Sequence, residues 1–260
     1  MERRRAAMAW PISGLLLLCL VHVRTVAAEL EPAATAAYDR YVADATKVFL
    51  EEGRSHASPR DGELTIRPAR QDGIVSVPGG LVHHWIGATF INRATLADAL
   101  AISSAYENYP AVYRPVISSQ LLGRDGDTYH VQLRIKEGAA GVSAVLQVRS
   151  SVKFFFPSGT TAYSISTSDE IREVKDAGEP SERLLPAGQG SGYLWRAATL
   201  SRLIERDGGV AVEMETIGLS RTFPLMLAWI IEPIARRLGR KSVELSLQEF
   251  ASAVRARKAG

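Results

Sequence analysis

Three turn signals, each between runs of alternating apolar and polar residues, constrain this fold more than any other feature. Asp125-Gly126 and Asp207-Gly208 are strong two-residue hairpin signals, and Ser158-Gly159 is a weaker one. The alternation around them predicts an antiparallel sheet with one apolar and one polar face. Its strands are expected at about 81–91, 114–123, 127–137, 142–156, 160–174, 191–205 and 209–220.

Counting outward from a two-residue turn predicts which side chains share a face. Around Asp207-Gly208 it gives the inward cross-strand pairs Leu203–Val212, Ser201–Met214 and Thr199–Thr216, with Trp195 on the same side. Arg202 and Glu213 then form an opposite-charge pair on the other face, which is expected to meet solvent.

The same count predicts inward sets for the other two hairpins. Around Asp125-Gly126 the set is Val116, Ser118, Gln120, Leu122, Tyr129, Val131, Leu133 and Ile135. Around Ser158-Gly159 it is Ser150, Val152, Phe154, Tyr163, Ile165 and Thr167. Hydroxyls therefore interleave with large apolar residues on the inward face. A cavity holding water or a ligand would give them hydrogen-bond partners. The open alternative is that several of them bond to one another or lie near open ends of the sheet.

Helices are expected at both ends of the chain. Residues 33–51 carry an apolar stripe, and with a short strand near 63–66 they form an N-terminal extension, 29–79. A helix over about 223–256 has apolar residues at helical spacing, among them Leu227, Ile230 and Ile231. It is the expected cover for the apolar face of the sheet.

The first 28 residues have the three parts of a secretory signal peptide. Arg3, Arg4 and Arg5 precede a short apolar run, which ends at Val26-Ala27-Ala28 before Glu29. Cleavage is expected near Ala28, with export to the periplasm or extracellular space; an uncleaved membrane anchor is the alternative.

The whole formal net charge and the single cysteine both lie within this leader. The formal net charge is +3, and residues 1–28 hold four Arg and one Glu, so 27 basic and 27 acidic side chains remain. The basic balance therefore gives no argument for nucleic-acid binding. Cys19 also leaves with the leader, so disulfides, thiolate metal sites and a cysteine nucleophile are excluded from the exported chain.

Several stretches resemble the START-like superfamily, also called SRPBCC, which includes polyketide cyclases and birch-pollen-allergen-type proteins. The resemblance rests on Gly80 to Trp85, Ala94 to Leu100, Tyr106 to Pro110, Tyr113 to Val116, Leu122 to Asp127, Leu194 to Arg196 and Glu205 to Gly209. Within the superfamily these stretches are most similar to a group of exported bacterial proteins. The resemblance implies an α+β helix-grip domain over 80–258, in which a curved antiparallel sheet grips the long C-terminal helix. It also implies a cavity for apolar molecules between sheet and helix, and it brings no catalytic residue with it.

Candidate site residues follow from the inward faces and the final helix. The predicted cavity lining is His84, Tyr129, Leu133, Tyr163, Trp195, Thr199, Ser201, Met214, Leu227, Ile230 and Ile231. Arg114 and Asp169 are candidates for its polar mouth, with a structural ion pair and a carboxylate at the sheet rim as their alternatives. His84 is either a core histidine or a base reaching the cavity. No metal site is expected, since His83 and His84 point to opposite faces of one strand.

These observations favour an exported protein that binds a hydrophobic small molecule or lipid, without a cofactor. A cyclase-type enzyme using the same cavity and a cavity-free scaffold for a protein partner remain alternatives. The basic residues of the last helix are expected to be solvated, with membrane contact as the minority interpretation.

Overall fold

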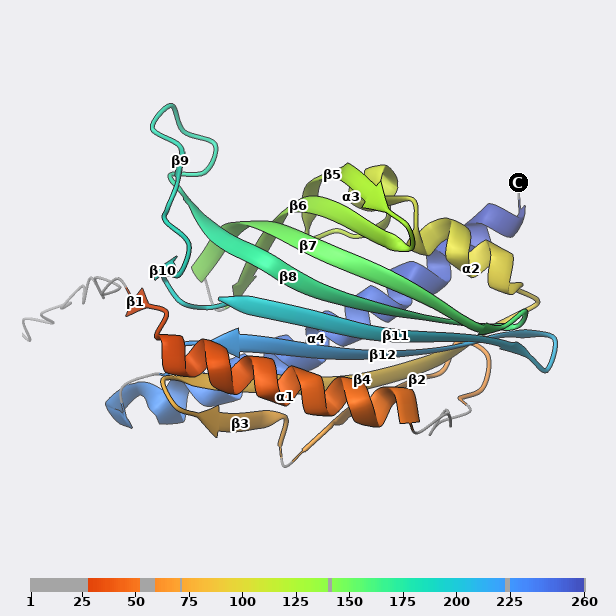
Figure 1. The fold of residues 1–260 in the computed structure, drawn as a ribbon, viewed down its shortest axis with the longest axis horizontal. Helices are drawn as coiled ribbons and strands as arrows, with labels where there is room; N and C mark the ends of the chain where they lie inside the picture. Colours follow the sequence, from red (N-terminus) through yellow and green to blue (C-terminus); the bar gives the residue numbers. More distant parts are fainter. Residues whose placement is uncertain (1–27, 52–58, 71, 140–141, 223–224, 260) are drawn as a thin grey trace, which may run out of the picture.

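The computed structural model describes residues 28–51, 59–70, 72–139, 142–222 and 225–259 (Figure 1). The side chains of 137–139, 142, 225–235 and 259 lie outside that description.

Helices occupy both ends of the chain, and strands fill most of the middle. The helices are α1 (Pro32–Glu51), α2 (Leu96–Ser103), the 3-10 helix η1 (Tyr106–Asn108), α3 (Tyr109–Val112) and α4 (Leu225–Ala259). The first strands are β1 (Ala28–Glu29), β2 (Leu64–Pro68), β3 (Ile74–Val77) and β4 (Gly80–Asn92). The later strands are β5 (Val116–Asp125), β6 (Thr128–Ala139), β7 (Val142–Ser158), β8 (Thr161–Lys175), β9 (Arg183–Leu184), β10 (Gln189–Gly190), β11 (Arg196–Arg206) and β12 (Gly209–Ser220).

Within the described part of the chain, ten strands form one antiparallel sheet. Its order is β2-β4-β12-β11-β8-β7-β6-β5, with β3 paired to β4 and β9 to β8. The predicted N-terminal extension thus contributes two strands to the same sheet as β4. Each of the three turn signals joins neighbouring strands: β5 to β6, β7 to β8 and β11 to β12. The expected strand series is confirmed.

The sheet lies between two helices, with α1 on one face and α4 on the other (Figure 1). We call the face that carries α4 the inner face and the face that carries α1 the outer face. On the inner face α4 buries Val243, Leu247 and Phe250 against the sheet and α2. An antiparallel sheet that grips a long C-terminal helix is the START-like helix-grip fold, and the predicted fold class is confirmed.

The outer face under α1 contains charge as well as apolar residues. Arg202 donates a hydrogen bond from Nη1 to Glu213 Oε1 at 2.6 Å, and both side chains are at least 95% buried. Arg202 also donates to the main-chain carbonyl of Phe49 at the end of α1, and its guanidinium lies 4.4 Å from the centre of the Phe49 ring. The predicted pairing of Arg202 with Glu213 is confirmed. Its predicted solvent exposure is wrong, because α1 covers this part of the face.

The start of the described chain is held to a loop between β8 and β11. Ala28 pairs with Gly190 and Glu29 with Gln189, and the main-chain N–H of Leu30 donates to the carbonyl of Gly188 at 2.7 Å. The predicted cleavage position therefore lies within a two-residue strand.

Candidate functional site

Over the part of α4 whose side chains are described, the helix packs against one side of the inner face, where a glycine in β4 lets it approach closely. A Cβ on Gly87 would lie 2.5 Å from Val243 Cγ1 and 2.6 Å from Leu247 Cδ1, closer than real Cβ atoms come. Gly239 of α4 approaches the Trp85 ring as closely, with a Cβ position 2.7 Å from Trp85 Nε1. The helix packs mainly against β2, β4 and β12, and the inner faces of β11, β8 and β7 lie beyond these contacts.

Two rows of side chains cross this inner face from strand to strand. The first row runs Trp85, Thr216, Thr199, Ser166, Val152 and Tyr129 on β4, β12, β11, β8, β7 and β6. The second runs Met214, Ser201, Ser164 and Phe154 on β12, β11, β8 and β7. We call the five Ser and Thr residues of these rows the hydroxyl rows: Thr216, Thr199, Ser166, Ser201 and Ser164. Both rows therefore have hydroxyls in the middle and an aromatic ring at the β6–β7 end.

The hydroxyl rows are not sealed by packing. All five residues keep intermediate exposure, as do Met214 and Leu133 on the same face. Within the described part of the chain, none of the five hydroxyls has a hydrogen-bond partner. Mutual hydrogen bonding, one part of the alternative explanation, is therefore wrong for these five residues. They are available to water or to a ligand.

The aromatic end of the rows opens into a small hollow of about 120 Å³. Leu100, Ser104, Arg124, Asp127, Tyr129, Phe154 and Phe156 line it. The Phe154 ring meets Tyr129 edge to face and stacks on Phe156, which is 55% exposed. Tyr129 also contacts Tyr106, whose pKa is raised by burial. The lining of the hollow is mixed, with Leu100 and aromatic rings beside one serine hydroxyl, one cation and one carboxylate.

The opposite end of the inner face combines a buried apolar cluster of Leu146, Val148 and Ile171 with several polar groups. His83 faces inward and its Nε2 lies 2.8 Å from Ser220 Oγ. Burial lowers the pKa of His83 to about 4, so the imidazole is neutral at pH 7. Glu173 accepts hydrogen bonds from the Ser191 main-chain N–H at 2.7 Å and from Ser191 Oγ at 2.6 Å.

Some predicted lining residues lie on the inner face, and others do not. Tyr129, Leu133, Thr199, Ser201 and Met214 face inward as predicted, and their contact with a ligand stays a prediction. The side chains of Leu227, Ile230 and Ile231 lie outside the described residues.

His84, Tyr163 and Trp195 lie on the α1 side, so their predicted inward placement is wrong. His84 is 5% exposed; its Nδ1 lies 3.1 Å from the Tyr41 hydroxyl of α1 and its Nε2 lies 2.9 Å from Glu215 Oε2. It is a core histidine with both nitrogens satisfied. Tyr163 contacts Phe49 of α1. Trp195 precedes β11 and packs in the cluster that contains Tyr38 of α1.

The β7–β8 hairpin explains the Tyr163 error and reveals inward residues that sequence counting missed. Ser158 pairs with Thr161, so the turn lies one residue beyond the predicted Ser158-Gly159. A bulge between Phe155 and Ser158 then shifts the register, so Phe154 faces Ser164 and not the predicted Tyr163. This moves Ser164 and Ser166 inward. The available signal was Pro157, which cannot donate to a strand ladder and favours a bulge.

Strand β5 shows the same effect. Irregularities near residues 116–118 and 121–123 pair Ser118 with Arg134 and Gln120 with Gln132, on the outer face. Ser119 takes the predicted inward place opposite Leu133, and its buried Oγ has no hydrogen-bond partner among the described residues.

The two predicted mouth residues make local contacts elsewhere. Arg114 is exposed and pairs with Glu249 of α4, which is the structural ion pair kept as its alternative. Asp169 is exposed, and both its carboxylate oxygens accept from Ser151 Oγ at 3.0 and 3.1 Å. His130 Nδ1 lies 3.1 Å from the same Oγ on the outer face. The predicted inward placement of Asp169 is wrong, because it sits at the bulge between Ser168 and Glu170.

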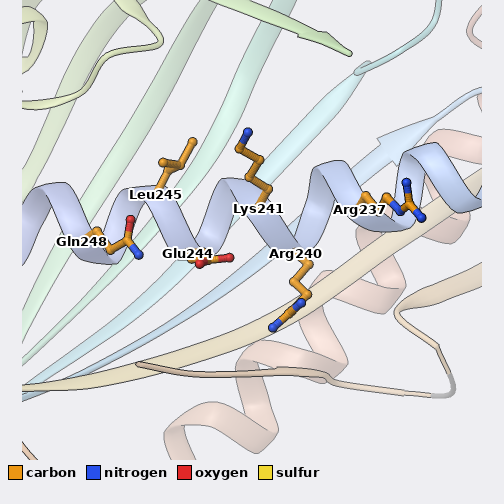
Figure 2. A pocket seen from close by; sticks show the side chains of 6 residues that line it. All are labelled: Arg237, Arg240, Lys241, Glu244, Leu245 and Gln248. Carbon is orange, nitrogen blue, oxygen red and sulfur yellow. The ribbon is translucent and has the colours of Figure 1, made fainter. Parts of the chain in front are cut away.

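A second hollow, of about 190 Å³, lies along α4 itself (Figure 2). Arg237, Arg240, Lys241, Glu244, Leu245 and Gln248 line it. Arg237, Arg240 and Lys241 are exposed, consistent with a solvated basic face. No helix in the described ranges is long and apolar enough to span a membrane. Nor do the described residues bring three or more His, Cys, Asp or Glu side chains together as a metal site.

Comparisons with known proteins describe the fold only. No protein-family model and no curated protein sequence matches this chain. A solved protein from Thermus thermophilus is similar at 13% identity, covering 66% of this chain and 97% of its own, with a TM-score of 0.47. A STAR-related lipid transfer protein from Xanthomonas axonopodis is similar at 15% identity, covering 74% of this chain and 98% of its own, with a TM-score of 0.46. An aromatase/cyclase from Streptomyces is similar at 13% identity, covering 66% of this chain and 91% of its own, with a TM-score of 0.42. At these sequence identities, similarity of structure gives no information about the ligand or the activity of this chain.

Proposed function

We propose that this chain is an exported binding protein that holds an apolar small molecule or lipid on the inner face, beside α4. The observation that carries the proposal is the incomplete cover of that face. Large apolar residues such as Met214 and Leu133 and the hydroxyl rows all keep intermediate exposure in the middle of the sheet. If this face served only stability, we would expect it to be fully covered, because apolar surface left exposed to water adds nothing to the free energy of folding.

The composition of the face agrees with binding. Small-molecule sites are mostly apolar, with a few polar groups that fix orientation. Here Phe154 and Tyr129 supply apolar surface at one end, and the hydroxyl rows supply the polar groups. A STAR-related lipid transfer protein is among the solved proteins similar in fold, and a lipid is one of the ligands proposed here.

A large side chain in the middle of the face tests the proposal. Ser201→Trp should abolish uptake of the fluorescent apolar probe N-phenylnaphthylamine, because the new ring fills the space that the ligand would take. Its melting temperature should fall little, whereas overpacking a closed core costs about 1–3 kcal/mol. Ser151→Trp, on the outer face, is the matched control and should bind like the parent. A parent protein that takes up no probe contradicts the proposal, as does an Ser201→Trp variant that binds normally.

Export is proposed from the leader. N-terminal sequencing of the exported protein should begin at Glu29, within two residues. The pairing of Glu29 with Gln189 and the Leu30–Gly188 hydrogen bond do not involve the leader, so the new terminus would stay attached to the fold. Recovery of a soluble cytoplasmic protein beginning at Met1 would contradict export.

A further inference from the structure

We propose that this chain forms a weak symmetric dimer, in which the β5 edge of one sheet pairs with the β5 edge of a second copy of the chain. The proposal goes beyond ligand binding and does not depend on it. It follows from the exposure of β5, from the absence of charge along it, and from the positions of its two bulges.

β5 is a free edge of the sheet, beyond β6 (Figure 1). An edge strand presents unpaired main-chain N–H and C=O groups that a strand of another chain can bind. None of the ten residues of β5 is buried. Of the large hydrophobic residues that are exposed in the described part of the chain, three lie on this strand: Ile117 at 50%, Leu121 at 36% and Leu122 at 48%. The edge that meets water is therefore apolar.

Charge does not protect β5, although the other edge of the sheet is protected. Proteins protect edge strands with charged side chains, prolines, short strands or a covering helix. β2, the opposite edge, has five residues, includes Arg67 and Pro68, and packs in the cluster that contains α4. β5 has ten residues, and residues 115–123 carry no charge. A long uncharged edge of this kind favours pairing with an identical strand.

The two bulges of β5 lie symmetrically about its centre. The register with β6 skips one residue at Ile117 and one at Leu122. These two residues are equally far from the point midway between Ser119 and Gln120. An antiparallel partner related by a two-fold axis through that point would place Ile117 of each copy opposite Leu122 of the other. Bulges normally turn an edge away from pairing, but a symmetric partner carries the same bends at the matching positions.

The same axis brings opposite charges together at the ends of the strand. It places Arg114, which precedes β5, opposite Asp125 of the second copy, the last residue of β5. The Arg114 side chain is 75% exposed and pairs with Glu249, and a guanidinium has five N–H donors, so further donors remain. Asp125 is exposed and makes no ion pair with a described residue. A symmetric dimer has two such contacts, which favour this register.

The size of the interface predicts weak association. Ten residues at about 3.4 Å each form a strip about 34 Å long, and a sheet with its side chains is about 10 Å thick. Pairing therefore covers roughly 340 Å² on each copy, or roughly 700 Å² in total. Stable interfaces bury about 1,200 Å² or more. The expected dissociation constant is accordingly on the order of 100 μM.

Sedimentation equilibrium of the purified protein, from about 5 to about 500 μM, measures the association. The weight-average mass of the parent should rise from that of one chain toward that of two. Ile117→Lys and Leu122→Glu should each weaken the dimer at least about tenfold, because each variant places two charges in apolar contacts. The double variant Ile117→Lys/Leu122→Glu should recover most of this loss, because each lysine then meets a glutamate of the second copy. Ile117→Lys/Leu122→Lys should recover none of it.

Val48→Lys is the matched control, because Val48 is 46% exposed and lies on α1 instead of β5; it should associate like the parent. Every variant should keep the far-ultraviolet circular dichroism spectrum of the parent, which separates lost pairing from lost folding. A parent that stays monomeric at the highest concentration overturns the inference, as does a Lys/Glu variant that associates no better than the Lys/Lys variant. If a monomeric parent binds phosphatidylcholine vesicles through Ile117 and Leu122, the edge contacts lipid and the inference is equally wrong. Uptake of N-phenylnaphthylamine tests the proposed function separately.

Discussion

The buried pair of Arg202 and Glu213 allows a sharp test of whether α1 covers the outer face. In Glu213→Gln the guanidinium loses the Glu213 carboxylate while remaining 2% exposed under Phe49. Breaking a buried ion pair from one side costs about 3–5 kcal/mol. Arg202 keeps the Phe49 carbonyl and its contacts with the Phe49 and Tyr163 rings, so we expect the lower end of that range, about 3 kcal/mol.

The measurement is urea unfolding at pH 7, followed by tryptophan fluorescence and far-ultraviolet circular dichroism. The control is Arg149→Met, which breaks the more exposed pair with Glu170 (48% and 28% exposed side chains) and should change stability by less than about 1 kcal/mol. The double variant Arg202→Met/Glu213→Leu removes both charges and should recover much of the lost stability. If Glu213→Gln costs no more than Arg149→Met, the pair faces water and α1 does not cover it.

Two further predictions concern the packing of α4 and the protonation of His83. Gly87→Ala should destabilise the protein by about 1–3 kcal/mol, because the added methyl meets Val243 and Leu247; Gly123→Ala, with nothing within 4 Å, should stay within about 0.5 kcal/mol in the same urea assay. The pKa of His83 falls from 6.5 to about 4 on folding, so the unfolded chain binds the proton more readily, and stability should drop by up to about 3 kcal/mol as pH falls from 6.5 to 4. The unfolding midpoint should depend less on pH across that window in His83→Gln than in the parent protein. An unchanged pH dependence would show that His83 is not the titrating group.

Sequence counting succeeded where a hairpin has no bulge. Every pair predicted around Asp207-Gly208 is present, because the β11–β12 ladder runs without interruption from Arg206–Gly209 to Arg196–Leu219. It failed for Tyr163, where one extra residue near Pro157 turns the following side chains of β8 to the other face, as far as the second bulge at Asp169. The error removed Ser164 and Ser166 from the predicted site and put Tyr163 in it.

Other errors came from contacts between distant parts of the chain. An opposite-charge pair such as Arg202 and Glu213 is typical of a solvent-exposed face of a sheet. The pair is buried here because α1 docks over it. The alternation along β4 does identify two faces, but it does not say which of them α4 takes. His84 was therefore assigned to the inner face, although its partners Tyr41 and Glu215 belong to the α1 side.

The distance in sequence between α1 and its docking site constrains the order of assembly. The Tyr38 hydroxyl donates to the carbonyl of Ile217, which lies 179 residues further along the chain. At synthesis rates of about 5–20 residues per second, α1 waits roughly ten to thirty-five seconds before β12 exists. Throughout that interval the apolar side of α1, with Tyr38, Val42 and Phe49, lacks the part of its docking site that β11 and β12 supply. A newly made chain therefore presents a helix that a holding chaperone can bind, and release must await the last hairpin.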